Sequence, residues 1–453
     1  MKKYVNLRLS IFWCLLALTI IACDRSDNVE DPDLNYFIKY YGGVGNQYGV
    51  DMLALDDGSF LLLGNYSEST SKSDIYMLRV DAEGEVIWEK RFSEHIDDSE
   101  ELDNEHISTA LDIEPTSDGN FIVLADYQAD IGSPTNIKLL KISPDGSLLD
   151  SVKFGSNYFD EQRNTHDHGH TVTPLTDGGF IVSGTTQFTD QWSSSTNPGS
   201  DPGDTFNYRF DANLDLWGSE WGPVTPGFGA QESDEFDVAV KTLEVGNKFY
   251  VFGYTNANLS NNNPNGRLGL FYFERGASGS LGDVYYPGNV LNVNDTKIHF
   301  AKQVPAELGA GFIVIGTSQS NIGLSEIFVA QFRNSLSFAP PLGNDATIYR
   351  TLPLQRNISG VAATSSISGS YGYLVLGNEV RSTGATNFWL TKVDQGGNVV
   401  WSTTFGSEAE DDFGAAVTEL PDGKIVVLGT MGLADNQFKM ALIKMNPRGE
   451  LLK

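Results

Sequence analysis

Phe60-Leu61-Leu62-Leu63-Gly64 is an apolar run that starts with an aromatic residue and ends with a small one. Six further runs follow the same pattern, aromatic or Ile first and Gly or Ala last, at intervals of 52 to 69 residues. Such runs are typical of buried β-strands. Near-equal spacing indicates one supersecondary unit repeated seven times. The six further runs begin at Phe121, Phe180, Phe249, Phe312, Tyr373 and Ile425.

Each unit has the turn signals of four antiparallel strands. Asp57-Gly58 precedes the first run, and Asp-Gly favours tight hairpins because glycine accepts a positive φ. A third segment alternates apolar and polar residues at 75–81, and a second glycine turn at Gly84 leads into Val86-Ile87-Trp88. Four antiparallel strands per unit predict the blade of a β-propeller, so we expect an all-β fold with seven blades. A stack of solenoid repeats is the alternative, but solenoid coils are usually shorter.

The two ends of the repeat region predict how the ring closes. The last unit stops at Lys453, too early for a fourth strand of its own, while residues 36–41 have the pattern of a fourth strand without three partners. We expect this N-terminal segment to complete the seventh blade, which would close the ring and remove an exposed sheet edge. The fourth strands of units four and five are expected near 283–286 and 346–351.

Composition agrees with an all-β chain and excludes one class of partner. The 453 residues include 47 Gly, 26 Phe and 18 Tyr, and no long stripe of helical periodicity is present. The net charge is −29, and no basic stripe offsets it. Because this field repels phosphate backbones, we expect no nucleic-acid partner.

The N-terminus reads as an export signal. Lys2, Lys3 and Arg8 flank an apolar run to Ala22 that is too short for a stable membrane span. We therefore divide the chain into a signal peptide at 1–22, an acidic tether at 23–34 and a propeller at 35–453. Removal of the signal takes Cys14 with it and leaves Cys23 as the only cysteine, so no internal disulfide is possible.

Two resemblances accompany these patterns. Ile20-Ile21-Ala22-Cys23 resembles the lipobox of bacterial lipoproteins, which implies a lipid on Cys23 and an outer-membrane location. The acidic stretch after it is similar to surface-display signals of Bacteroidetes-type lipoproteins, although a periplasm-facing position stays open. Residues 35–453 resemble secreted bacterial propeller repeats, which have an Asp-x-x-Gly-x-x-x-Trp motif followed by an Asp-Gly-Gly-Phe/Tyr motif. The first motif stands here at 81–88 and 394–401. That resemblance implies no particular activity.

The connections on one rim of the predicted propeller are long, acidic and rich in histidine. Loops on a rigid scaffold concentrate binding residues, so this rim is the predicted functional face. Its residues suit calcium or another divalent cation, although solvated charge and a packing role for His168 are the favoured alternatives. His168 and His170 would share one face of an extended strand and could chelate a metal together. The candidate cation ligands are His166, Asp167, His168, His170, Asp411 and Asp412.

A glycan is the other ligand class that the sequence suggests. Trp192 and Asp190 lie in the longest loop, where an indole could stack on a sugar ring or simply anchor the loop. No nucleophile with a base, no metal triad and no phosphate loop was found in the sequence. We therefore expect a non-enzymatic binding or scaffold protein for a glycan, a peptide or an envelope protein. The alternative is a hydrolase or lyase that acts on polysaccharide.

Overall fold

The computed structural model describes residues 36–69, 72–93, 107–129, 133–155, 166–186, 204–218, 221–223, 237–255, 269–285, 294–304, 311–319, 325–332, 346–353, 358–367, 369, 371–395, 397–433 and 437–451. These residues form strands and turns and contain no helix, as the sequence predicts. Accordingly, no helix within them is long and apolar enough to cross a membrane.

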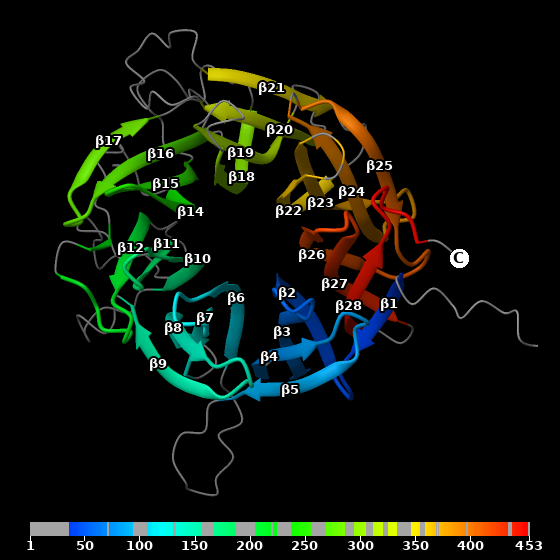
Figure 1. Cartoon of the computed structure of the whole chain (residues 1–453), viewed down its shortest axis with the longest axis horizontal. Helices are drawn as coiled ribbons and strands as arrows, with labels where there is room; N and C mark the ends of the chain where they lie inside the picture. The colour runs from blue at the N-terminus through cyan, green and yellow to red at the C-terminus, as the bar shows by residue number, and fades with distance from the viewer. Residues whose placement is uncertain are drawn as a thin grey trace, which may run out of the picture.

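The strands form antiparallel meanders of four, arranged around a common axis as in a β-propeller (Figure 1). Five sheets have four strands and one has eight. The eight-stranded sheet is two such meanders, joined only where Ser73 pairs with Ile107. The innermost strands are β2 (Asn46–Ala54), β6 (Ile107–Pro115), β10 (Asp167–Pro174), β14 (Asp237–Val245), β18 (Asn294–Gln303), β22 (Ile358–Ser366) and β26 (Asp412–Glu419).

The second strands contain the repeated apolar runs. They are β3 (Phe60–Ser69), β7 (Phe121–Gln128), β11 (Phe180–Thr186), β15 (Lys248–Thr255), β19 (Phe312–Gln319), β23 (Gly372–Val380) and β27 (Ile425–Leu433). The third strands are β4 (Lys72–Val80), β8 (Asn136–Ile142), β12 (Asp204–Phe210), β16 (Gly269–Gly276), β20 (Ser325–Phe332), β24 (Thr386–Asp394) and β28 (Gln437–Met445).

The outer strands include the N-terminal one. They are β5 (Val86–Phe92), β9 (Leu148–Phe154), β13 (Gly222–Pro223), β17 (Leu281–Tyr285), β21 (Ala346–Pro353), β25 (Val399–Phe405) and β1 (Phe37–Tyr41). β1 pairs antiparallel with β28, from Phe37 opposite Lys444 to Tyr41 opposite Met440. The N-terminal segment therefore lies where the sequence placed it, as the outer strand of the β26–β28 sheet.

The core lies between neighbouring sheets. Leu62 and Leu78 of the β2–β5 unit pack with Leu428 and Met440 of the β26–β28 sheet, and all four are buried. Gly64 makes this contact possible, because a Cβ there would lie 2.2 Å from the Met440 side chain. The small residue that ends each repeated run is therefore required by packing and not by turn geometry.

The two rims of the structure differ in their connections. The rim that we call the tight-turn rim has the turns between first and second strands and between third and fourth strands, such as 55–59 and 81–85. Gly58 and Gly84 adopt positive φ there, as the Asp-Gly and second glycine signals predict. The opposite rim, which we call the link rim, has the connections between units, including 42–45 and 406–411. One predicted long loop, 67–73, is instead a short hairpin in which Ser67 pairs with Ser73.

Neighbouring units are joined by a repeated hydrogen bond near the link rim. The residue after the small residue of the second strand is polar, and its side chain accepts the amide of the next unit's innermost strand. This hydrogen bond joins Ala110 N to Asn65 Oδ1 at 2.8 Å, Gly169 N to Asp126 Oδ1 at 2.8 Å, Gly414 N to Asn378 Oδ1 at 2.7 Å and Gly49 N to Thr430 Oγ1 at 3.0 Å.

A second repeated contact joins units at the tight-turn rim. A basic residue near the end of the third strand donates to a carbonyl in the next unit's third-to-fourth turn. The pairs are Arg79 to Pro144 at 3.0 Å, Lys141 to Ala212 at 3.1 Å, Arg209 to Ala277 at 2.7 Å and Lys444 to Ala82 at 2.8 Å.

Candidate functional site

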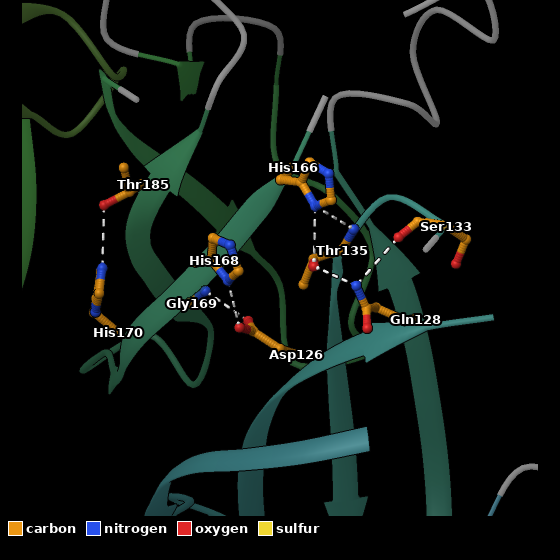
Figure 2. A network of polar contacts seen from close by, with 9 residues as sticks. All are labelled: Asp126, Gln128, Ser133, Thr135, His166, His168, Gly169, His170 and Thr185. Atoms are coloured by element: carbon orange, nitrogen blue, oxygen red, sulfur yellow. Dashed lines mark hydrogen bonds and ion pairs between the residues drawn. The ribbon is translucent and has the colours of Figure 1, made fainter. Parts of the chain in front are cut away.

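His168 is held by Asp126 at the link rim. Its Nδ1 lies 2.8 Å from Asp126 Oδ2, and the other oxygen of that carboxylate accepts the Gly169 amide (Figure 2). The His168 side chain is 50% exposed, whereas that of Asp126 is 15% exposed. The hydrogen bond to Asp126 raises the pKa of His168 above its usual value against the opposing effect of burial. The pair therefore presents an oriented, readily protonated imidazole to solvent.

His166 has a different partner, and its pKa shifts in the opposite direction. Its Nδ1 accepts the backbone amide of Thr135 at 3.1 Å, so Nδ1 has no proton in the neutral ring. Burial and then the neighbouring His168 lower the pKa of His166. The two imidazoles stack nearly parallel, with ring centroids 6.4 Å apart. Of the predicted site residues, these two are the ones brought side by side.

His170 and His168 have different side-chain partners. The register of β10 against β11 shifts between Gly169 and Thr171, which makes His170 the extra residue of a β-bulge. His170 Nε2 lies 3.1 Å from Thr185 Oγ1, well away from the His168–Asp126 pair (Figure 2). Within the described ranges, no group of three or more His, Cys, Asp or Glu side chains is arranged to hold a metal. The cation hypothesis therefore gains no support from this segment.

Asp167, Asp411 and Asp412 have structural partners. Asp167 begins β10, is fully buried, and its amide donates to Thr135 O at 2.9 Å. Asp412 begins β26 in the same way, and its carboxylate accepts the amides of Ser407 and Gly432. Burial raises the pKa of Asp412, and the two backbone hydrogen bonds oppose that rise. Asp411 Oδ1 accepts the Thr386 amide at 2.8 Å, so these carboxylates hold backbone in place.

Cys23, Asp190 and Trp192 lie outside the described residues. The acidic links at 97–105 and 232–235 lie outside them as well.

A polar network that sequence reasoning missed crosses the innermost strands of four units. Thr171 Oγ1 donates to Asp112 Oδ2 at 2.8 Å, and Lys241 lies 3.0 Å from Glu114 and 3.3 Å from Thr171. Asp51 accepts the amides of Met52 and Ile113 at 2.8 and 3.3 Å. The network therefore links β2, β6, β10 and β14 across the middle of the ring.

The electrostatics of this network depend on Lys241. Burial alone would lower the pKa of Lys241, but Asp112, Glu114 and Asp51 together raise it. Burial and the neighbouring Asp112, to which it is hydrogen bonded, raise the pKa of Asp51 well above its usual value. Two carboxyl groups in contact share a proton more readily than both ionise. The Lys241 ammonium thus supplies the positive charge beside these carboxyl groups.

A second missed feature is a repeated histidine. His299 is the bulge residue of β18, as His170 is of β10, and its Nε2 lies 3.0 Å from Thr317 Oγ1. Burial among the surrounding strands lowers the pKa of each to about 4. The His170 side chain nevertheless keeps contact with solvent. Both rings are therefore neutral at physiological pH. Alignment of Gly169 with Ile298 would have revealed this pair, and alignment of Gly49 with Ala110 would have revealed the Asp51–Asp112 pair.

No protein-family model matches this chain, and no curated protein does. Solved structures are similar at low sequence identity. The β-propeller domain of the trilobed protease from Pyrococcus furiosus is 9% identical, over 88% of this chain and 95% of that chain, with a TM-score of 0.44. A GH93 α-L-arabinofuranosidase of Fusarium graminearum is 9% identical, over 74% and 93%, at 0.43. A protein of unknown function from Dyadobacter fermentans is 9% identical, over 75% and 93%, at 0.43. At these TM-scores the likenesses carry no argument about fold, ligand or activity.

Proposed function

We propose that this protein is a lipid-anchored cell-envelope propeller of seven blades that binds a ligand at its link rim without turning it over. The observation that carries the binding proposal is the His168–Asp126 pair. Its imidazole is half exposed, oriented by a carboxylate at 2.8 Å, and placed on the rim where the units connect. Such a group suits hydrogen bonding to a polar ligand, whether a glycan, a peptide or a protein partner.

The ring closure in this proposal is supported by contacts between the two ends of the chain. β1 pairs with β28, Gly49 donates to Thr430, and Lys444 donates to Ala82. Each of the last two reproduces a contact found between units that are consecutive in sequence. A closed ring leaves the innermost strands rigid, as a binding scaffold requires.

The alternative, a polysaccharide hydrolase, requires two carboxyl groups about 5 Å apart or more. Asp112 raises the pKa of Asp51 as a neighbouring carboxyl group, and the Lys241 ammonium interacts with both. Glu114 is paired with Lys241 at 3.0 Å. These three carboxyl groups are therefore engaged with Lys241 and with one another.

A glycan and peptide array, followed by product analysis, tests the proposal. The non-lipidated Cys23→Ala chain should bind one ligand class, and His168→Gln should weaken that binding. His299→Gln is the matched control, because His299 lies within β18 and is hydrogen bonded to Thr317 rather than to a carboxylate. New reducing ends after incubation with polysaccharide would favour the hydrolase, and cleavage products with unsaturated ends would favour a lyase.

A further inference from the structure

The chain enters the ring at the tight-turn rim. Phe37 pairs with Lys444, near the end of β28 that leads into the last tight turn, while Tyr41 lies toward the link rim. Lys39 forms an ion pair with Glu85 of the 81–85 turn, and Tyr41 OH donates to Gly84 O at 2.9 Å. β1 is therefore fixed in direction, with its first residue, Phe37, nearer to the tight-turn rim than Tyr41.

The distance from Cys23 to this point is short. Tyr36 lies thirteen positions after Cys23. Residues 24–33 are polar and acidic, a composition that predicts a flexible coil, and a coil of this length spans about 20 Å. A nine-residue strand such as β2 is about 30 Å long. A lipid on Cys23 would therefore keep the tight-turn rim nearer to the bilayer than the link rim.

Exposed apolar side chains gather at that same rim. Val86 and Ile87 begin β5 and are 48% and 54% exposed. Leu148 with Leu149 begins β9 at 50% and 52%, and Val399 with Val400 begins β25 at 48% and 51%. At the link-rim end of these strands the apolar residue is covered instead, with Phe154 only 4% exposed.

A tryptophan adds to this surface. Trp217 is 49% exposed beyond the tight-turn end of β12, where its amide donates to Arg209 O at 2.7 Å. Its ring stacks on the Arg209 guanidinium, 4.8 Å from the centroid. Tryptophan beside a cationic side chain is favoured where headgroups meet water.

We propose that the tight-turn rim faces the bilayer and rests on its headgroup region through the paired residues of β5, β9 and β25 together with Trp217. This orientation depends on the lipid anchor proposed above. It directs the link rim, with the His168–Asp126 pair, away from the membrane and toward soluble or surface ligands.

Single-cysteine labelling tests the orientation on the full lipidated chain. Mature protein should have no thiol besides the acylated Cys23, so one introduced cysteine accepts one fluorophore. The protein is reconstituted into vesicles of phosphatidylethanolamine and phosphatidylglycerol that contain a lipid with a nitroxide headgroup. Val86→Cys and Val399→Cys should lose fluorescence. Val44→Cys, which is 90% exposed on the link rim, should retain it.

The outcomes separate the anchor from the orientation. If the wild type floats with vesicles and Cys23→Ala does not, the anchor holds. Equal quenching at Val44 and Val86, or stronger quenching at Val44, then overturns the orientation alone. If the wild type floats no better than Cys23→Ala, the anchor and the orientation both fall. Uniformly weak quenching of a protein that floats also overturns the proposal and would favour a protein partner on the tight-turn rim.

Discussion

The amide of Gly49 donates a 3.0 Å hydrogen bond to the hydroxyl of Thr430, 381 positions later in the chain. The same contact joins consecutive units, as between Gly169 and Asp126. The first and last units thus meet through the same kind of hydrogen bond that joins two consecutive units. If the contact contributes to stability there, its loss should be measurable.

Loss of the Thr430 hydroxyl should therefore destabilise the protein. Thr430→Val keeps the shape of the side chain but leaves the Gly49 amide without its partner, at a cost of about 1–3 kcal/mol. Thr430→Ser retains the hydroxyl and should cost less. Urea unfolding monitored by circular dichroism checks both variants, and equal midpoints for the two would contradict the role of the bond.

The glycine that ends most of the repeated runs gives a second prediction. A Cβ on Gly184 would lie 2.1 Å from His168 O and 2.5 Å from the Phe206 ring. Gly184→Ala should cost about 3 kcal/mol by overpacking. Gly269 lies in a strand with its nearest atom at 4.0 Å, so Gly269→Ala should change stability by no more than about 0.5 kcal/mol. An equal loss of stability in Gly184→Ala and Gly269→Ala would argue against the close contact at Gly184.

The sequence predicted the repeated strands well because their pattern is local. The runs from Phe60 and Phe121 begin β3 and β7 where expected, and even the weakly marked fourth strands appear as β17 and β21. The contacts of the candidate site were harder to predict from the sequence, because they join different units. Asp126 and His168 are 42 positions apart, and nothing in the pattern of either strand pairs them. The position of the bulge at His170 likewise depends on how β10 pairs with β11, which the sequence of β10 alone does not specify.

Lys241 is the residue on which the inner-strand network most depends. Lys241→Met leaves Glu114 and the Asp51–Asp112 pair without their cation, so it should cost about 3–5 kcal/mol. The double variant Lys241→Met with Glu114→Gln removes one uncompensated charge and should recover part of that loss. Thermal melts of both variants test this, and a double variant less stable than Lys241→Met alone would contradict the pairing.

The bulge histidines predict acid sensitivity. Burial lowers the pKa of His170 and His299 to about 4, so the unfolded chain binds protons at these sites more readily than the folded one. Stability from both sites should be present above pH 6.5 and should be lost as the pH falls toward 4. His170→Gln with His299→Gln should reduce the drop in melting temperature between pH 7 and pH 4.5. An unchanged drop would assign the acid sensitivity to other groups.

The His168–Asp126 pair predicts the opposite sign. Because Asp126 raises the pKa of His168, the folded state binds a proton more tightly there than the unfolded state. The stabilisation is present below the unfolded value near 6.5 and is lost as the pH rises through the folded value. Burial also raises the pKa of Asp126, so the two proteins are compared at pH values where that carboxyl group is ionised. The stability advantage of wild type over Asp126→Asn should therefore be larger at pH 6 than at pH 8.5.

NMR titration provides the direct measurement: the His168 ring should titrate above 6.5 in wild type and lower in Asp126→Asn. Equal values in the two proteins would remove the electrostatic basis for placing the binding site at this residue.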